Sequence, residues 1–301
     1  MKYPRVSVIL LNMNQPELSV ACVESLQKCT YPDLEIILID QASKDNSVEV
    51  LENKFPNIKF IANKINLGFT GGNNRGMREA TGEYFLLLNN DTEVEPAFLE
   101  PLIDALEKDS TAGAASPLIR FYQNPMKIQY AGGPERIDLL HGRNSWRGWM
   151  SDYPSRFSKI ENTTAAHGAA FIIKRHVAEE VGLLDDHFFI YFEELDWSLR
   201  IRKTGYNILF VPGSEVLHKE SMTMPKEHPF RVRMMMRNRI LLSRKHLNPF
   251  SFAVSLLYTS FISFPVNCLR YLIRQKVDLL KAYSQGFVQG VLNKKYQPTT
   301  L

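Results

Sequence analysis

Four short apolar runs, each followed by polar residues, constrain the fold of this chain more than any other feature. They occupy residues 5–12, 34–40, 58–63 and 84–90 and are nearly continuous in hydrophobicity and rich in β-branched side chains. Such runs are typical of strands in a parallel sheet that is covered on both faces. The segments between them have the apolar spacing of helices. This alternation predicts an α/β fold, with an open, mostly parallel sheet and right-handed crossovers.

The polar side chains that follow the four runs indicate a ligand-binding edge. In open α/β sheets, ligands bind beyond the carboxyl ends of the strands. Turn formation explains each of these residues separately, but it explains their concentration less well. The residues concerned are Asn12, Asn14, Asp40, Asn63, Asn66, Asn89, Asn90 and Asp91.

Residues 66–76, NLGFTGGNNRG, are rich in glycine and asparagine and lie between the third apolar run and the helical segment that follows it. A turn of this kind lets backbone N–H groups approach a phosphate or a ring closely. It could equally be a surface loop softened by glycine. The spacing is neither that of a dinucleotide-binding loop nor that of a P-loop, so neither chemistry follows from it.

Three carboxylates, Glu193, Glu194 and Asp196, follow the aromatic segment FFIYF. They open a helical pattern that ends near Gly205. Acidic residues in the first turn of a helix complement its macrodipole, which is one explanation for them. The other explanation is catalytic, since aromatic neighbours reduce solvation and raise the pKa of a carboxyl group toward a value useful for a general base.

The charge of the chain is unevenly distributed along its length. Residues 1–225 carry a net charge of −7 and residues 226–301 carry +11, although the whole chain has only +4. This contrast predicts two parts, a catalytic domain over 1–225 and a basic, apolar helical extension over 226–301. Residues 247–269 hold no charged side chain and reach the roughly 20 residues that span a bilayer.

Polar side chains dilute the hydrophobicity of this uncharged segment. We expect its helices to lie on an anionic membrane leaflet, with a buried helical cap or a homodimer contact as alternatives. The basic extension has few aromatic residues placed as stacking platforms, so nucleic acid is not an expected partner. Three cysteines without disulfide or metal-site spacing, and an N-terminus unlike a signal peptide, favour a cytoplasmic location at the inner face of the membrane.

Seven motifs that occur in order along residues 4–221 resemble the family 2 glycosyltransferases. Within that family, which has a GT-A fold, the resemblance is to the branch that includes bacterial rhamnosyltransferases. It implies a Rossmann-like, mostly parallel mixed sheet flanked by helices. The motifs are VSVILLNMN, ILIDQASKDNS, NLGFTGGNNRG, LLLNNDTEV, GAAFIIKR, GLLDDHFFIYFEELDWSLRIRKTGY and VPGSEVLHKES.

The resemblance implies a nucleoside-diphosphate sugar donor, dTDP-rhamnose or a UDP-sugar, and a divalent cation. Asp40 resembles the residue that accepts the base N–H, and Asp45 lies in the same loop. The positions that resemble those lining the nucleotide and sugar pocket are Asn66, Gly68 and Asn73.

The metal motif of the family, D-x-D, is replaced here by Asn89-Asn90-Asp91, so only Asp91 brings a negative ligand. Mg²⁺ or Mn²⁺ tolerates this, because the diphosphate and water supply further oxygen ligands. His218 matches a family position that often completes the site, and an imidazole suits Mn²⁺ better than Mg²⁺.

The acidic pair of the family aligns with Glu193-Glu194, and the base is its second member. The resemblance therefore assigns the base to Glu194, with Asp196 as a fallback that otherwise orients the site or caps the helix. It implies transfer with inversion to a hydroxyl of a saccharide or lipid-linked saccharide in polysaccharide assembly. Residues 116–155 and 165–175 resemble the acceptor-facing part. The alternatives are a nucleotidyltransferase and a non-catalytic nucleotide-sugar-binding protein.

Overall fold

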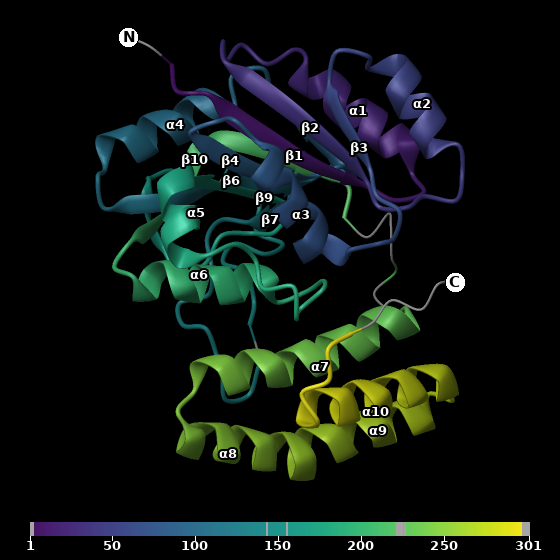
Figure 1. The fold of residues 1–301 in the computed structure, drawn as a ribbon. Helices are drawn as coiled ribbons and strands as arrows, with labels where there is room; N and C mark the ends of the chain where they lie inside the picture. Colours follow the sequence, from purple (N-terminus) through teal and green to yellow (C-terminus); the bar gives the residue numbers. More distant parts are fainter. Residues whose placement is uncertain (1–2, 143, 155, 221–224, 226, 297–301) are drawn as a thin grey trace.

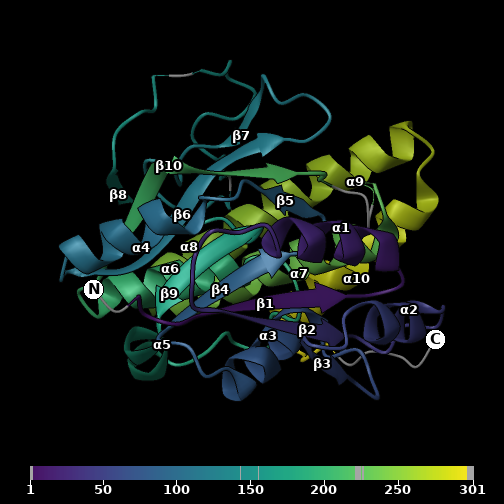
Figure 2. The ribbon, with the colours of Figure 1, turned by 90° about the horizontal axis from the view of Figure 1, so that it is seen from above.

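The computed structural model describes residues 3–296 except 143, 155, 221–224 and 226, and a single mixed sheet forms its centre (Figure 1). Across the sheet the strands follow the order β3-β2-β1-β4-β9-β6-β10-β5, with β7 paired to β6 and β8 paired to β10 (Figure 2). The expected α/β architecture is confirmed.

The first four strands are parallel, as the apolar runs predict. Helices separate them in the sequence, and each crossover returns the chain to the same end of the sheet. The bounds are β1 Val6–Asn12, α1 Pro16–Leu26, β2 Leu34–Asp40, α2 Ser47–Lys54, β3 Lys59–Ala62, α3 Gly68–Glu79 and β4 Tyr84–Asn89.

The second half of the sheet is mixed, because β9 inserts antiparallel between β4 and β6. β10 runs parallel to β6, and therefore in the same direction as β4. The carboxyl ends of β1, β2, β4, β6 and β10 consequently share one edge with the amino end of β9. The bounds are β5 Thr92–Val94, β6 Ala112–Phe121, β7 Ile128–Tyr130, β8 Glu161–Thr163, β9 Ala170–Lys174 and β10 Asn207–His218.

Apolar side chains alternate between the two faces of the strands and fill a core on each side. In β1, Val8 and Leu10 pack toward α1, α2 and α4, whereas Ile9 packs toward α3, α5 and α6. The strands are therefore buried on both faces, which explains their unbroken hydrophobicity. The remaining helices of these layers are α4 Leu99–Lys108, α5 Arg175–Val181 and α6 Glu193–Lys203.

Helix α3 begins at Gly68, so most of the glycine-rich segment is helical rather than a turn or a loop. Its glycines let the helix approach the sheet closely. A methyl group on Gly76 would lie 2.4 Å from Ile9 Cγ2, and one on Gly72 would collide with Gln41. Close helix packing, rather than phosphate binding, explains these two residues.

The C-terminal helices form a further layer beneath α6 (Figure 1). Helix α7 lies against the catalytic part, and α10 packs along α7. Residues Pro249–Ile273 form one helix without a break in the chain direction, named the outer helix here. One turn of it, just before Pro265, is π-helical instead of α-helical, because Pro265 lacks the N–H that an α-helix would need. The bounds are α7 Pro229–His246, α8 Pro249–Tyr258, η1 Thr259–Ser263, α9 Phe264–Ile273 and α10 Val277–Val291.

Candidate functional site

A chain of side-chain hydrogen bonds joins three strand ends. Asn12 Nδ2 donates to Asp40 Oδ2 at 2.9 Å, and Ser19 Oγ donates to Asn12 Oδ1 at 2.7 Å. Asn90 Nδ2 in turn donates to Ser19 Oγ at 2.9 Å. Asn12 and Asp40 are fully buried. Asp40 also accepts from the Ser43 N–H at 2.8 Å, so in this structure these polar groups satisfy one another and fix the edge of the sheet.

Two of the candidate residues hold the loop between β2 and α2. Asn14, in the left-handed region with φ 54°, accepts at Oδ1 from the Lys44 N–H at 2.8 Å, and its own N–H donates to Ser43 Oγ. Asp45 is exposed and accepts from the Ser47 N–H at 3.0 Å, where α2 begins. Both residues thus order the loop that begins at Asp40.

The residues at the start of α3 connect the first half of the chain to the aromatic segment before α6. Asn66 Oδ1 accepts from the Gly68 N–H at 2.7 Å. Gly68 has φ +73°, and a methyl group there would lie 2.5 Å from both the carbonyl oxygen and the ring of Phe189. Asn73 is buried inside α3, where its Nδ2 donates to Phe69 O at 2.9 Å. Of these three, Gly68 makes the closest approach to the acid-bearing segment.

Gln41 is a buried residue of the strand-end edge that the sequence did not single out. Its Oε1 accepts from Asn63 Nδ2 at 3.0 Å and from the Leu67 N–H at 3.1 Å, while its Nε2 donates to Gly68 O at 2.9 Å. One amide therefore fixes the whole connection from β3 to α3. Its position directly after Asp40, at the end of β2, was the available signal.

Asp91 and His218, which are far apart in the sequence, meet at this edge. Both are 6% exposed, and Asp91 Oδ1 lies 3.1 Å from His218 Nε2. The pair is not aligned as a hydrogen bond, so Asp91 Oδ1 is a buried oxygen without a donor. His218 Nδ1 lies 2.8 Å from Gln129 Oε1. Because an amide oxygen only accepts, Nδ1 carries a proton, and in the neutral imidazole the lone pair of Nε2 faces Asp91.

This donor set suits a divalent cation. A buried carboxylate oxygen lacks a partner, and the neighbouring imidazole is held in the tautomer that binds metals. Gln129 was not identified from the sequence, where a glutamine carries no metal-site signal. Among the described residues, no group of three or more His, Cys, Asp or Glu side chains is placed to hold a metal. A cation at this position would therefore have two protein ligands among the described residues, Asp91 and His218.

His167 lies beside this pair, with its ring 6.1 Å from that of His218 and 5.0 Å from that of Trp146. Its Nδ1 accepts from the Ala169 N–H at 3.0 Å. Burial, followed by the proximity of His218, lowers the pKa of His167 to about 3. His167 is consequently neutral at physiological pH, and it shapes the site without adding charge.

Residues 167–169 connect the metal-binding candidates to the acidic pair. The Asn89 N–H donates to Ala169 O at 3.0 Å, which places this segment against the end of β4, two residues before Asp91. On the same segment, a methyl group at Gly168 would lie 3.9 Å from Glu194 Cβ. Asn89, two residues before Asp91, and Glu194 therefore both adjoin one three-residue stretch of chain, although they are far apart in the sequence.

The two members of the acidic pair have different surroundings. Glu193 is 5% exposed, and its Oε2 is buried without a hydrogen-bond partner. Burial, reinforced by the charge of Glu194, raises the pKa of Glu193 well above the usual carboxyl range. Glu194 is partly exposed, and burial raises its pKa to about 7. The pKa of both carboxyl groups is thus raised, and that of Glu194 lies in the neutral range.

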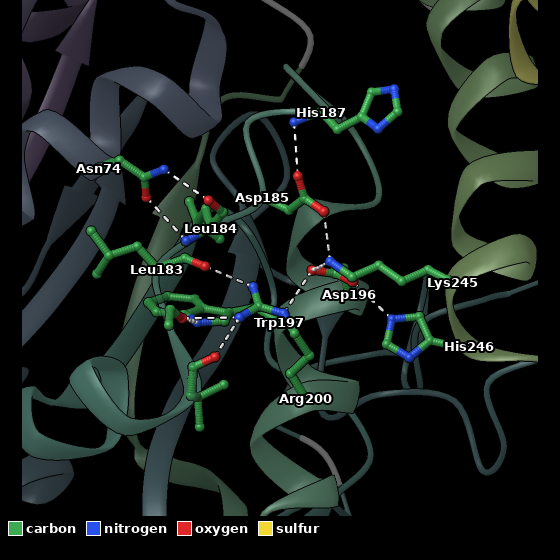
Figure 3. Close-up of polar contacts among 12 residues, drawn as sticks. Asn74, Leu183, Leu184, Asp185, His187, Asp196, Trp197, Arg200, Lys245 and His246 are labelled. Carbon is green, nitrogen blue, oxygen red and sulfur yellow. Dashed lines mark hydrogen bonds and ion pairs between the residues drawn. The ribbon is translucent and has the colours of Figure 1, made fainter. Parts of the chain in front are cut away.

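Asp196 belongs to a buried ionic cluster between α6 and α7 (Figure 3). Its carboxylate is fully buried and lies 2.9 Å from Arg200 Nε, 2.9 Å from Lys245 Nζ and 2.7 Å from His246 Nε2. Burial alone would raise the pKa of Asp196, but the hydrogen bond from His246 and the charges of Arg200 and Lys245 outweigh it and lower the pKa. Both oxygens engage cations, an arrangement suited to joining helices rather than to accepting a substrate proton.

Asp196 also differs from the expectation that it caps the helix. It is the fourth residue of α6, and its N–H donates to Phe192 O at 3.0 Å. The residue at the cap is Phe192 itself, in the left-handed conformation.

Comparisons with known proteins agree with this geometry. Residues 7–182 match the family model described as glycosyl transferase family 2. The chain is 24% identical, over 220 residues, to the N-acetylglucosaminyl-diphospho-decaprenol L-rhamnosyltransferase of Mycobacterium tuberculosis, covering 65% of this chain and 70% of that protein. It is 23% identical, over 301 residues, to the low-salt glycan biosynthesis hexosyltransferase Agl10 of Haloferax volcanii, covering 97% and 93% of the two chains.

A solved structure, that of GalNAc-T7 with UDP, GalNAc and Mn²⁺, has a similar fold. The TM-score is 0.61 at 23% identity, and the match covers 78% of this chain but only 47% of the GalNAc-T7 chain. The chain thus spans about half the length of that protein. Together with the mixed sheet flanked by helices, this likeness confirms the expected GT-A fold.

We predict that Asp196→Asn destabilises the protein by roughly 1–3 kcal/mol, because the neutral side chain loses the charge-assisted contacts of the buried carboxylate with Arg200, Lys245 and His246. Chemical denaturation measures the change. Asp104→Asn, in the exposed pair with Lys108, is the control and should change stability by less than about 0.5 kcal/mol.

The same variant has an expected pH signature. Because the folded-state pKa of Asp196 is lowered, its contribution is complete above the ordinary carboxyl range and is lost as the pH falls below about 4. Asp196→Asn should therefore show a shallower loss of stability on acidification. Equal stability of the variant and the wild type at pH 7 would contradict this role.

Proposed function

The chain belongs to glycosyl transferase family 2, and on that basis we propose that this glycosyltransferase transfers a sugar with inversion from a nucleoside-diphosphate sugar to a saccharide hydroxyl. The observation that carries the proposal is that residues 167–169 contact Asn89, two residues before Asp91, and also lie beside Glu194. One acid is suited to a cation beside a diphosphate, and the other has a pKa suited to general-base catalysis.

Asp91 and His218 would hold the divalent cation, with Gln129 orienting the imidazole. When bound, the cation neutralises negative charge on the departing nucleoside diphosphate. Two protein ligands suffice if the diphosphate and water complete the coordination. The GalNAc-T7 structure, which contains Mn²⁺ and UDP, is consistent with Mn²⁺ as a candidate.

Glu194 acts as the general base in this proposal. Its carboxylate accepts the proton of the acceptor hydroxyl while that oxygen forms a bond to the anomeric carbon. The bond from the anomeric carbon to the diphosphate oxygen breaks, and the electron pair leaves with the nucleoside diphosphate. A single displacement of this kind inverts the anomeric centre. The raised pKa of Glu193 favours its protonated form, which keeps a second negative charge away from the base.

The donor and acceptor follow from the relatives. The mycobacterial relative is named as a rhamnosyltransferase that acts on a diphospho-decaprenol-linked sugar. We propose dTDP-rhamnose or a UDP-sugar as donor and a saccharide or lipid-linked saccharide of cell-surface polysaccharide assembly as acceptor. A lipid-linked acceptor requires the enzyme to work at a membrane surface, which we place on the cytoplasmic side.

The outer helix offers a surface for that contact. It has a mean hydropathy of 1.5, and only 11% of its most apolar window is buried. Phe250 is 79% exposed and Phe261 is 75% exposed, which is unusual for large apolar side chains in water. Exposed basic residues, Arg270 and Arg274, lie at the end of the helix. Apolar side chains with adjacent positive charge fit the interface of an anionic leaflet, so we propose peripheral membrane contact.

We predict that Glu194→Gln lowers kcat by about 10²-fold or more, because the amide cannot accept the proton. Glu193→Gln is the matched control. It imitates the protonated form that the raised pKa of Glu193 favours, so its kcat should stay within about threefold of the wild type. Donor binding should be retained in both variants. In the wild type, kcat should fall as the pH drops through about 7, because Glu194 becomes protonated. A fully active Glu194→Gln would rule out this base.

Metal binding is tested by thermal shift with UDP or dTDP, each with and without Mn²⁺. The increment due to Mn²⁺ should disappear in Asp91→Asn and His218→Ala. In Gln129→Leu the apparent Mn²⁺ affinity should fall about 10- to 100-fold, because the imidazole loses its orienting partner. Asp104→Asn serves as the control. An unchanged increment in Asp91→Asn would place the cation elsewhere.

Membrane contact is tested with vesicles of phosphatidylcholine containing phosphatidylglycerol, and with phosphatidylcholine alone. The wild type should sediment with the anionic vesicles, and Phe261→Asp should weaken this at least about tenfold, because one buried Phe contributes about 1.5–3 kcal/mol. Ile160→Asp, at an exposed apolar residue outside the outer helix, should bind normally. Absence of vesicle binding, or a dimer in solution that Phe261→Asp dissociates, would refute the lipid assignment.

A further inference from the structure

The segment from His187 to Phe192, named the acid loop here, leads directly into Glu193 and Glu194. Three of its bulky residues have left-handed backbone conformations, with φ 67° at Phe189, 73° at Tyr191 and 73° at Phe192. Such conformations are unfavourable for residues other than glycine and persist only when the surrounding structure imposes them. The acid loop therefore needs restraints from outside its own sequence.

Asn238 of helix α7 supplies most of these restraints. The side chain is fully buried, and its Nδ2 lies 2.8 Å from Phe188 O, 2.8 Å from Ile190 O and 2.9 Å from Tyr191 O. The two N–H bonds of one amide are thus shared among three carbonyl groups of the acid loop. The carbonyl groups of a buried, irregular loop lose their hydrogen bonds to water and gain none from a regular helix or sheet. This single amide supplies hydrogen bonds to three of them.

Arg237, the preceding residue, continues the same arrangement. It is fully buried, and its Nη2 donates to His187 O at 2.9 Å and to Lys294 O at 2.9 Å. Its Nη1 also donates to Asn238 Oδ1 at 2.5 Å, which fixes the orientation of the Asn238 amide. Two adjacent residues of α7 therefore bind the backbone of the acid loop at four positions.

Helix α7 also binds the chain on the C-terminal side of the acidic pair. Lys245 and His246 bind the carboxylate of Asp196, two residues after Glu194 (Figure 3). The first turn of α6 is consequently held by α7 both before and after Glu194. These contacts of α7 involve neither Asp91 nor His218, while Gly68 of α3 approaches the acid loop at Phe189.

We propose that Asn238 is a positioning residue for Glu194, holding the acid loop in the strained conformation that directs the base toward the acceptor hydroxyl. The inference rests on the proposed role of Glu194 as the base. It assigns to the C-terminal extension a part in the chemical step that is separate from membrane contact.

The test is Asn238→Asp, a nearly isosteric change that replaces the amide donor by an oxygen facing three carbonyls. The folded variant should lose about 10²-fold in kcat, because displacement of a catalytic group by about 1 Å costs this much. Binding of UDP with Mn²⁺ should stay within about twofold of the wild type. In Asn238→Ser, which adds no charge, the acid limb of the kcat–pH profile should move below 7, because a loosened first turn admits water to Glu194. Asn267→Asp, on α9, is the matched control and should behave as wild type.

A double-mutant cycle separates positioning from general destabilisation. If Asn238 acts through Glu194, Asn238→Asp should cost little further activity in a Glu194→Gln background. Multiplicative losses, an unchanged kcat, or equal losses of kcat and nucleotide binding would each overturn the proposal. If Asn238→Asp does not fold, Asn238→Ser replaces it, because serine keeps one hydrogen-bond donor. Its kcat should fall about tenfold, and the same three outcomes would overturn the proposal. A fully active Glu194→Gln would instead refute the underlying function.

Discussion

The convergence of strand ends at one edge of the sheet is the constraint on which the rest of this structure depends. β1, β2, β4, β6 and β10 run in one direction, and β9 runs against them, so their carboxyl ends meet its amino end. This topology brings Asp91 and His218 together and lays residues 167–169 beside them. The side chains at this edge bond chiefly to one another, which leaves a buried oxygen of Asp91 as an unsatisfied polar atom.

The second requirement is a base in a fixed position, and here the C-terminal helices contribute. The acid loop has an unfavourable backbone conformation, and α7 compensates for it with hydrogen bonds from Arg237 and Asn238. Packing follows the same pattern, because Phe188, Phe192 and Leu195 share an apolar cluster with Leu241 and Leu242 of α7. The extension is therefore tied to the catalytic part through a core as well as through polar contacts. The outer helix, by contrast, leaves its apolar face uncovered.

Much of the fold was predictable because its signal is local. Strands that are covered on both faces have unbroken apolar sequences, so their positions were predictable. The alternation of helices and strands along the chain predicted the crossover connections. The antiparallel insertion of β9 was not predictable, because pairing across the sheet leaves no periodic pattern in one segment. Amides such as Gln41, Gln129 and Asn238 also escaped notice, since their roles depend on partners that are distant in the sequence. The contacts of Asp196, the fallback candidate for the base, were not predictable for the same reason, because its partners Lys245 and His246 lie about fifty residues away.

The most direct test of the account is a crystal structure of the protein grown with UDP and Mn²⁺, with anomalous scattering used to locate the metal. The account predicts an anomalous peak within bonding distance of Asp91 and His218, the diphosphate on that metal, and the Glu194 carboxylate facing the same bound nucleotide. A manganese ion bound elsewhere, or a Glu194 side chain directed at a different surface from the nucleotide, would contradict it.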